Sequence, residues 1–387
     1  MRVIVAPDSF KGALDAFSAA RALASGVRRA LPEARVTELP VADGGEGTAA
    51  VLLAALGGSW ATVTVPDPLG RPVVAPWARL DTGGAVVEAA AAIGWALVPE
   101  AWRDPWHLSS AGLGHLLLAA VASGAREVAV ALGGTGTNDG GLGLLLALGA
   151  RCEDARRQVF RPTLYTLDRV RRVDLRPARR RLGSTAVTAL VDVFNPLDGP
   201  RGATAVFGPQ KGVTPNAIAV LDRRLARFGR VLEAASGLAL RERQGAGAAG
   251  GLGAALAALT GGNLVSGIEV VLDRIGFEGR AAGSDLVLTG EGRTDAQTLE
   301  GKAVLGVVRR ARRLGVPVVC LSGAVAEEAY DLYAHGCTAI WAVADGPMTL
   351  AEAVARTPIL LERAAEAAVR LWAAGRAPSG FTLPSPG

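Results

Sequence analysis

Short apolar strands alternate with helices at both ends of this 387-residue chain, and this pattern restricts the fold more than any other feature of the sequence. Near the N-terminus, strands are predicted at Val3–Ala6 and Val36–Leu39, on either side of a helix at Phe17–Ala30 whose apolar residues share one face. Near the C-terminus, strands at 285–289, 316–321 and 339–343 alternate with helices at 303–314, 326–334 and 350–370. The alternation predicts a parallel, doubly wound α/β domain of the Rossmann or flavodoxin-like type.

The middle of the chain follows a different pattern. Short strands are predicted at 62–65, 73–80 and 85–87 with proline and glycine turns between them, and further helical and strand stretches follow at 127–132, 186–191 and 204–206. We therefore expect residues 1–60 and 282–387 to form the parallel-sheet domain, and residues 61–281 to form a second α/β domain inserted into it. A cleft between two domains is a common ligand site, so we expect the active site there.

The charge of the chain is modest, with a formal net charge of +5 at pH 7. This balance fits an anionic small molecule at least as well as a nucleic acid, which calls for a concentrated basic face. The strongest run of charge, Arg151–Arg181, contains eleven arginines but few aromatic residues on which bases could stack. We interpret it as a solvated surface and expect no nucleic-acid partner.

The three cysteines, Cys152, Cys320 and Cys337, lack the spacing of a metal site and cannot all pair. Such a set is typical of reduced thiols in a cytosolic protein. The longest apolar stretches, near 113–122 and 252–259, are too short to span a membrane, and the chain opens on a strand with no signal peptide before it. We expect a cytoplasmic protein without membrane contact, and the sequence leaves a homo-oligomer open.

Only three lysines occur among the 41 basic residues, and each of them, Lys11, Lys211 and Lys302, adjoins a glycine. A compact ammonium group beside flexible backbone is suited to holding phosphate oxygens. Glycine is abundant here, with 50 residues, so adjacency alone is partly chance. The three lysines are nevertheless candidates for phosphate contact.

Five glycine-rich turns stand where strands end or helices begin, at 6–12, 42–48, 133–141, 245–251 and 290–295. Glycine lets backbone N–H groups converge on anionic oxygens, and a following helix adds its positive N-terminal end. Four of the five turns also contain a carboxylate. Amides and lysines beside acids indicate phosphate with Mg²⁺, although each turn taken alone is explained as well by a tight connection.

Two familiar nucleotide motifs do not apply. The run Gly245-x-Gly247-x-x-Gly250 matches the dinucleotide pattern, but the charged residues 241–244 before it cannot form a buried strand. The pair Gly301-Lys302 is followed by Ala303 and lacks the upstream glycine of a Walker A loop. The sequence therefore predicts neither NAD binding nor a P-loop kinase.

A further acid and amide follow the predicted strand at 186–191. Asp192 and Asn195 stand just before Pro196, at the end of that strand. An acid and an amide at this point suit metal binding or contact with a substrate hydroxyl, and an Asx turn before the proline explains them equally well.

Taken in order, the segments resemble the bacterial glycerate kinase family, in particular its glycerate 2-kinases. The resemblance rests on APDSFKG at 6–12, VADGGEGT at 41–48, PLG at 68–70, GGTGTNDGG at 133–141, DVFNPL at 192–197, VFGPQKG at 206–212, GAGAAGGLG at 245–253 and TGEGRTDAQT at 289–298 with Gly301-Lys302. It implies ATP-dependent phosphorylation of D-glycerate with Mg²⁺, giving 2-phosphoglycerate, by two α/β domains with the active site between them.

Site residues follow from these motifs and their chemistry as hypotheses. The catalytic candidates are Asp8, Lys11, Asp43, Asp192 and Lys211, with Asp43 and Asp192 leading as the base. The substrate-binding candidates are Ser9, Asn195, Arg293 and Asp295, with Arg293 for the glycerate carboxylate. The nucleotide-binding candidates are Gly133, Gly134, Thr135, Gly136, Thr137, Asn138, Gly245, Gly247, Gly250 and Lys302, and the metal candidates are Asp192 and Glu291.

One departure from the family pattern keeps other functions open. Where family members usually have Ser-x-Gly-Thr-Gly-Glu, this chain places Leu113 and His115 at the threonine and glutamate positions. A kinase of another small hydroxy acid on the same scaffold is therefore an alternative, and a non-catalytic nucleotide- or phosphate-binding protein is a second one. The sequence leaves the identity of the base open as well.

Overall fold

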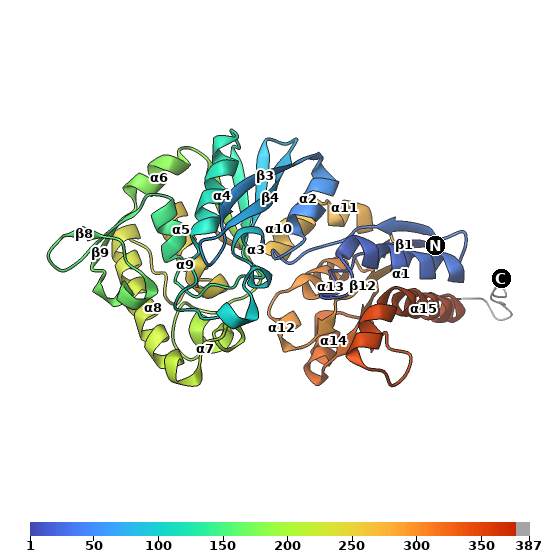
Figure 1. The fold of residues 1–387 in the computed structure, drawn as a ribbon. Coiled ribbons are helices and arrows are strands. Elements are labelled where there is room, and N and C mark those ends of the chain that lie inside the picture. The colour runs from blue at the N-terminus through green and yellow to red at the C-terminus, as the bar shows by residue number, and fades with distance from the viewer. Residues whose placement is uncertain (377–387) are drawn as a thin grey trace. The chain divides into compact units, whose positions relative to one another are not determined.

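The structure is a computed structural model, and it describes residues 1–376. The chain divides into two compact units (Figure 1). We call Met1–Asp43 with Ile268–Gly387 the terminal unit, and Gly44–Gly267 the middle unit. The boundaries that the sequence suggested, after residues 60 and 281, differ from these, because helix α2 (Thr48–Leu56) packs against strands of the middle unit and helix α11 (Phe277–Ala281) packs in the terminal unit.

A parallel sheet of five strands forms the centre of the terminal unit, in the order β16-β14-β12-β1-β2. Both chain ends contribute: β1 (Arg2–Val5) and β2 (Arg35–Glu38) come from the N-terminus, and β12 (Leu286–Thr289), β14 (Val318–Ser322) and β16 (Ala339–Ala342) come from the C-terminal part. A strand pair, β13 (Arg293–Thr294) and β15 (Ala324–Val325), lies beyond the sheet. The predicted parallel α/β fold with contributions from both ends is confirmed.

Helices cover this sheet because their apolar residues share one face. They are α1 (Ala16–Ala30), α10 (Gly267–Arg274), α11, α12 (Ala296–Leu299), α13 (Ala303–Arg313), α14 (Leu332–His335) and α15 (Leu350–Arg376), with a 3₁₀ turn at Glu327–Asp331 where a longer helix was predicted. Helices α1 and α15 lie side by side (Figure 1). Gly26 permits this approach, since a Cβ atom there would lie 2.0 Å from the Glu362 carbonyl oxygen.

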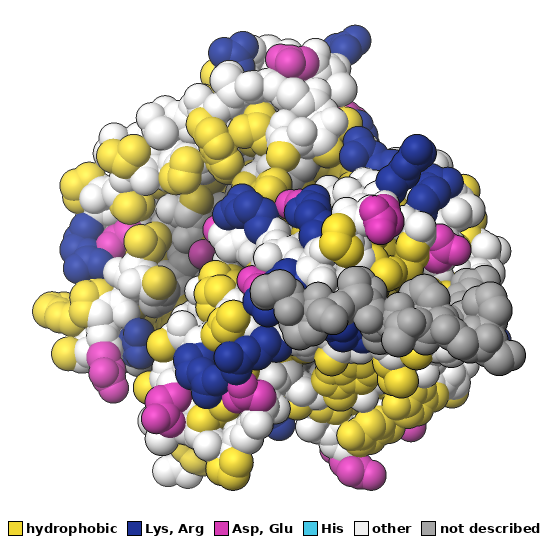
Figure 2. All heavy atoms as spheres, turned by 90° about the vertical axis from the view of Figure 1, so that its right-hand side faces the viewer, with side chains coloured by type: hydrophobic (Ala, Val, Ile, Leu, Met, Phe, Trp, Pro, Cys, Tyr) yellow, Lys and Arg dark blue, Asp and Glu magenta, His cyan; other side chains and the backbone are white. Residues whose placement is uncertain are grey.

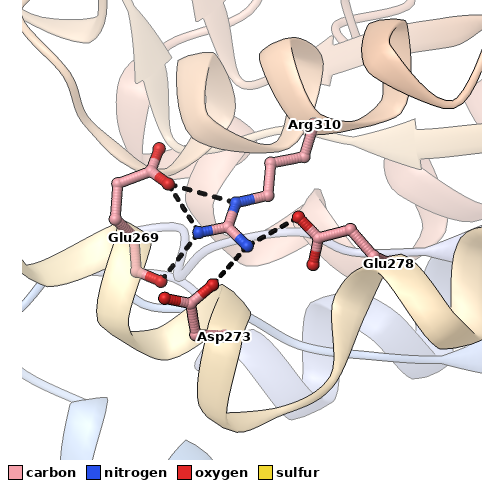
Figure 3. Close-up of polar contacts among 4 residues, drawn as sticks. All are labelled: Glu269, Asp273, Glu278 and Arg310. Atoms are coloured by element: carbon pink, nitrogen blue, oxygen red, sulfur yellow. Dashed lines mark hydrogen bonds and ion pairs between the residues drawn. The ribbon is translucent and has the colours of Figure 1, made fainter.

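One buried arginine joins three helices of the terminal unit (Figure 3). The Arg310 side chain on α13 is only 6% exposed and forms ion pairs with Glu269 and Asp273 of α10 and with Glu278 of α11. The nitrogen–oxygen distances are 2.5, 2.5 and 2.6 Å. We call this group the Arg310 cluster; it fixes α10 and α11 to α13.

The middle unit contains a mixed sheet of six strands, in the order β11-β10-β6-β5-β4-β3. Strands β5 (Gly84–Glu88), β6 (Glu127–Ala131), β10 (Ala186–Val191) and β11 (Leu264–Ser266) are parallel, whereas β3 (Gly58–Pro66) and β4 (Pro72–Leu80) form an antiparallel extension. Pro72 and Pro76 fit β4 because this strand pairs with β5 only at Ala78 and Arg79, so within the described part of the chain no second strand is paired beside the two prolines.

The remaining elements of the middle unit pack around this sheet. They are α2, α3 (Ala89–Ile93), α4 (Ala111–Ala122), α5 (Leu142–Ala147), α6 (Arg176–Leu182), α7 (Ala203–Phe207), α8 (Pro215–Ser236) and α9 (Ala248–Thr260), 3₁₀ turns at Trp95–Leu97, Glu100–Trp102, Leu164–Arg169 and Pro209–Lys211, and a small sheet of β7 (Arg151–Glu153), β8 (Val159–Phe160) and β9 (Arg172–Asp174). The core is continuous around buried Leu113, Leu144 and Phe228. Within residues 1–376, no helix has the length and apolar character needed to cross a membrane.

Candidate functional site

A pocket of about 500 Å³ opens in the terminal unit at the carboxyl ends of the parallel strands. Its lining includes eight residues that the sequence analysis selected: Asp8, Ser9, Lys11, Asp43, Glu291, Arg293, Asp295 and Lys302. They come from the segments after β1, β2 and β12, which are neighbours in the sheet. Ligands of open α/β sheets bind at this edge, so the position agrees with the expected chemistry.

Backbone hydrogen bonds beyond the strands hold these segments together. The Asp8 N–H donates to the Gly290 carbonyl at 2.9 Å, which continues the pairing of β1 with β12 by one further step. The Val41 N–H donates to the Pro7 carbonyl at 3.0 Å and extends the pairing of β1 with β2. Asp8 is thereby placed next to the turns that contain Asp43 and Glu291.

The glycines of the turn after β12 allow close backbone packing. A Cβ atom at Gly290 would lie 1.8 Å from the Leu321 carbonyl oxygen, and one at Gly323 would lie 2.5 Å from the Gly292 carbonyl oxygen. A side chain at either position would push the turns after β12 and β14 apart. Because Gly323 lines the pocket, this close packing helps to set the shape of the pocket.

Asp8 is the most strongly perturbed acid of this pocket. Its burial and the negative charge of Asp43 raise the pKa of Asp8 well above its ordinary value of 3.8, and Glu291 raises it further. The Ser9 N–H, which donates to Asp8 Oδ1 at 2.6 Å, and the positive charge of Lys11 lower the same pKa in part. A carboxylate in this environment is a better proton acceptor than a solvated one.

Glu291 holds its proton tightly for a similar reason. Burial raises the pKa of Glu291 from 4.5 to about 7, and the charges of Asp43 and Asp295 add to the rise. Thr298 Oγ1 donates to Glu291 Oε1 at 2.6 Å and opposes it, as does the charge of Lys302. Sequence reasoning missed Thr298, which is fully buried, although it belongs to the TGEGRTDAQT motif.

The polar residues at the rim of the pocket are held by local contacts. The Asp295 side chain accepts a hydrogen bond from the Gln297 N–H at 3.0 Å, caps helix α12, and lies 3.3 Å from Arg293 Nε. Lys302 Nζ donates to Gln297 Oε1 at 2.9 Å. Arg293 remains 66% exposed in its side chain, so its guanidinium group can reach a small acid in the pocket.

The donor atoms of this pocket suit a hard cation. Asp8, Asp43 and Glu291 offer only oxygen ligands, and burial, with the charge of Asp43 added to it, raises the pKa values of Asp8 and Glu291. Within residues 1–376, no three His, Cys, Asp or Glu side chains are arranged to hold a metal ion by themselves. This donor set fits Mg²⁺, which commonly takes one or two carboxylates together with phosphate oxygens.

Lys211 forms the second group of interest, in the middle unit. It follows Pro209 and Gln210 in a 3₁₀ turn, is 5% exposed, and its Nζ donates to the Thr137 carbonyl at 2.8 Å and to Thr135 Oγ1 at 3.2 Å. Burial lowers the pKa of Lys211 from 10.5 to about 8, and the charges of Asp139 and Asp192 oppose this shift. The structure thus brings two predicted catalytic residues, Lys211 and Asp192, into the same environment.

Asp139 holds the glycine-rich turn 133–141 in place through hydrogen bonds to its carboxylate. Its Oδ2 accepts hydrogen bonds from the Ser110 N–H and Oγ at 2.9 Å and from the Gly143 N–H at 3.0 Å, and its Oδ1 accepts one from the Gly141 N–H at 3.0 Å. The carboxylate therefore joins the beginnings of helices α4 and α5. Burial raises its pKa, and the four donors lower it.

The turns 133–141 and 245–251 pack on each other. The Gly140 N–H donates to the Gly250 carbonyl at 2.9 Å, and a Cβ atom at Gly250 would lie 2.2 Å from the Thr137 carbonyl oxygen. Ala249 adopts a left-handed conformation with φ of 53°, which is costly for a residue other than glycine and often marks a functional site. As predicted, no strand precedes the 245–251 turn, which follows helix α8 and a loop.

The predicted nucleotide-binding residues of the middle unit occupy different environments. Gly133 and Gly134 reach the surface, whereas Thr137 and Asn138 are fully buried. Within residues 1–376, Thr137 Oγ1 and Asn138 Oδ1 have no hydrogen-bond partner. Gly245 and Gly247 pack against Val191 and Pro196. Their nucleotide role stays a prediction, as does the substrate role of Asn195, whose Nδ2 donates to the Arg201 carbonyl at 2.8 Å.

The departure from the family pattern falls on helix α4. Leu113 is fully buried in the core of the middle unit, and His115 is exposed. A Cβ atom at Gly112 would lie 2.1 Å from the Pro66 carbonyl oxygen, so this glycine is needed for packing. The segment thus keeps its backbone role while two of its side chains change.

The arginine-rich segment 151–181 uses several of its side chains inside the fold. Arg179 Nη2 donates to the Ala258 carbonyl at 2.7 Å, and Arg181 Nη1 donates to the Ala147 carbonyl at 2.9 Å. Hydrogen bonds of this kind inside the fold do not favour a nucleic-acid surface over the solvated surface that the sequence predicted. Figure 2 shows another part of the surface, the right-hand side of Figure 1, where basic and acidic side chains are interspersed.

Comparisons with known proteins agree with one another. Residues 3–373 match the Glycerate kinase family. The chain is 40% identical to a glycerate kinase of Bacillus subtilis over 94% of its length and 96% of the relative's. It is 39% identical to a glycerate 2-kinase of Escherichia coli, over 91% and 93%. A crystal structure from Salmonella typhimurium LT2, provisionally named glycerate kinase 2, matches with a TM-score of 0.82 at 38% identity, over 97% of this chain and 99% of that one. The chain belongs to the glycerate kinase family.

Proposed function

We propose that this protein is an ATP-dependent kinase that transfers the γ-phosphoryl group of ATP to D-glycerate and forms 2-phosphoglycerate. Membership of the glycerate kinase family over nearly the whole chain supports the activity. The observation that supports phosphoryl transfer is the pocket of the terminal unit. It brings together acids and lysines, namely Asp8, Lys11, Asp43, Glu291 and Lys302.

Asp8 is our candidate for the general base. In the transfer, the glycerate hydroxyl gives its proton to a base, its oxygen forms a bond to the γ-phosphorus, and the bond to the β-phosphate oxygen breaks to release ADP. A general base is most effective when its pKa approaches the working pH, and burial beside Asp43 raises the pKa of Asp8 in that direction. We therefore place Asp8 ahead of Asp43 and Asp192, which the sequence favoured.

The cationic side chains have complementary tasks. Phosphoryl transfer depends mainly on positioning and on the stabilisation of charge on the transferred group. Lys11 lines the pocket beside Asp8 and would neutralise that charge, and Arg293 would pair with the glycerate carboxylate in a bidentate manner. Lys211, buried in the middle unit, orders the turn that contains Thr135 and Thr137 and adds a positive charge there.

Mg²⁺ belongs to the proposal as well. Glu291 with Asp43 would hold it in the terminal unit, and Asp192 is the candidate in the middle unit. When bound, Mg²⁺ neutralises charge on the ATP phosphates.

The three buried cysteines form no disulfide, which supports the proposal of a cytoplasmic enzyme.

A substrate panel tests this function. ADP release from ATP and Mg²⁺ is measured with D-glycerate, L-glycerate, lactate and tartronate, each with the wild type and with Lys11→Ala. We expect D-glycerate to give the highest kcat/KM and Lys11→Ala to lose on the order of a hundredfold or more in kcat, as for other oxyanion donors. A higher kcat/KM for another acid would instead identify the kinase of a different hydroxy acid, and ATP binding without ADP release would identify a binding protein.

A further inference from the structure

The pocket of the terminal unit changes in character along the sheet edge. The acids and lysines follow β12, β1 and β2, at one end of the strand order. At the other end, beyond β14 and β16, the lining is mostly apolar and includes Val343, Ala344 and residues of helix α15. The pocket therefore has a charged part and an apolar part.

Helix α15 forms most of the apolar part. Leu350, Ala353, Val354 and Leu360 line the pocket from one side of this helix, together with one polar residue, Thr357. Leu350 is 81% exposed, which is unusual for a leucine next to a pocket, and Ala353 and Val354 are half-buried. An apolar wall that stays accessible to solvent is suited to a ligand with an apolar face.

Glycerate does not use such a wall. It is a three-carbon acid with polar oxygen on every carbon, and a pocket of about 500 Å³ falls within the range typical of much larger ligands. ATP combines an anionic triphosphate with a flat, largely apolar base. Its two halves match the two parts of the pocket, because the charged part contains Lys11 and Lys302 and the apolar part contains the α15 side chains.

We propose that the adenine base and ribose of the nucleotide bind in the terminal unit against the apolar wall formed by Val343 and helix α15. The phosphates then extend toward Lys302 and Lys11. Burial of the base against Ala353 and Val354, which are half-buried, removes apolar surface from water and supplies affinity without base-specific hydrogen bonds. This inference rests on the proposed use of ATP, and it adds the site of the base.

A matched pair of substitutions on α15 tests the inference. Ala353 lines the pocket, whereas Ala355, two residues further along, is exposed and lies outside its lining. Successive helical residues are rotated by about 100°, so the two alanines face different sides. Ala353→Trp fills the apolar part of the pocket, and Ala355→Trp adds the same bulk outside it.

The readouts are the dissociation constant of ATP by calorimetry, the KM values of ATP and glycerate, and inhibition by inorganic tripolyphosphate, which has charge but no base. We expect Ala353→Trp to weaken ATP binding at least about tenfold, and to change tripolyphosphate inhibition and the glycerate KM by less than about twofold. Ala355→Trp should match the wild type. Val354→Ala, which removes contact without adding bulk, should weaken ATP binding by about threefold and guards against misfolding of the tryptophan variant.

The outcomes separate this inference from the function on which it rests. Unchanged ATP affinity in both Ala353→Trp and Val354→Ala would overturn it, even if the wild type phosphorylates glycerate. A rise in the glycerate KM without a change in ATP affinity would overturn it too, by assigning the apolar part to the acid. If the wild type binds ATP against this wall but releases no ADP with any hydroxy acid, the inference stands and the proposed function fails.

Discussion

The two units hold their buried charges in opposite ways. In the pocket of the terminal unit, Asp8 and Glu291 lie among other carboxylates, and burial with like charge raises their pKa values. In the middle unit, Asp139 accepts four hydrogen bonds from the protein, and Lys211 donates to two protein oxygens. The first arrangement places buried acids close together, beside Lys11 and Lys302, whereas the second holds its buried acid and its buried lysine in hydrogen bonds within the protein.

This difference indicates that the two units have different roles. Buried carboxylates that raise one another's pKa favour the uptake of a proton or a cation, and phosphoryl transfer to a hydroxyl group requires both a proton acceptor and a metal ion. A satisfied network instead fixes the position of the backbone around it. We infer that the terminal unit provides most of the proton transfer and metal binding, and that the middle unit provides an ordered framework with one buried cation.

Asp8→Asn gives the largest expected effect. The amide keeps the shape of the side chain but cannot accept the hydroxyl proton, so kcat should fall by on the order of a thousandfold, within the range for general bases. Stopped-time ADP assays with saturating ATP and glycerate measure this. Asp331→Asn, an exposed acid of the same unit, is the control and should leave kcat unchanged. A tenfold or smaller loss in Asp8→Asn would remove Asp8 as the base.

Lys211→Met tests what the buried charge in the middle unit contributes to stability and to catalysis. Burial lowers the pKa of Lys211 from 10.5 to about 8, so its charged form costs the folded state about 3 kcal/mol at pH 7. Methionine removes this cost but leaves the Thr137 carbonyl without its donor, which costs about 1–3 kcal/mol. We therefore expect little change in unfolding free energy at pH 7, together with a loss of roughly a hundredfold in kcat.

Urea unfolding measures the stability of Lys211→Met, and ADP assays on the same preparation measure its kcat. Stability of the wild type should also rise between pH 8 and 10.5, because the unfolded chain binds the Lys211 proton more tightly than the folded chain in that window. Lys211→Met should lack this rise. Strong destabilisation with normal kcat would show that Lys211 serves only the structure.

Arg310→Met tests whether a satisfied ion-pair network affects stability alone, even when it lies in the same unit as the pocket. The Arg310 cluster is a satisfied network within the terminal unit, so its loss should affect stability and spare catalysis. Since the three acids are half-exposed and can regain water, we expect a cost of about 2 kcal/mol, below that of a fully buried pair. Arg309→Met, an exposed neighbour, is the control for thermal unfolding. A loss of kcat at normal stability would contradict the distinction.

Glu291→Gln tests the raised pKa of the buried Glu291 carboxyl through the pH dependence of stability. The folded pKa of Glu291 is about 7 against an ordinary 4.5, because the carboxyl is buried, so the folded state binds its proton more tightly. The unfolding free energy of the wild type should therefore fall as the pH rises from 4.5 to 7, relative to Glu291→Gln. Parallel urea titrations at several pH values measure the difference. Curves that stay parallel across this window would show that the carboxylate is not perturbed.

The sequence predicted the polar part of the pocket because parallel strands bring their carboxyl ends to one edge. Asp8, Asp43 and Glu291 follow three strands, and strand adjacency alone places them together. It did not predict the apolar wall, since Leu350 and Val354 are distant in sequence and reach the pocket only through the packing of α15 on α1. Thr298 and Ser110 were missed because a buried hydroxyl leaves no pattern in the sequence.

The glycine-rich turns show a second limit of the sequence. Gly250 was selected for phosphate binding, yet its lack of a side chain is already required by the Thr137 carbonyl. Gly290 is likewise required by the Leu321 carbonyl. A glycine motif therefore marks close backbone approach, and only the neighbouring acids and lysines indicate what the approach is for.

The most direct measurement is the position of the new phosphate. The protein is incubated with ATP, Mg²⁺ and D-glycerate, and the product is passed to enolase without any phosphoglycerate mutase. Enolase accepts 2-phosphoglycerate, so our account predicts a phosphoenolpyruvate signal equal to the ADP released, and its loss in Asp8→Asn. ADP without phosphoenolpyruvate would point to phosphorylation at the 3-position, and no ADP from any preparation would contradict the assignment of this pocket as a glycerate kinase site.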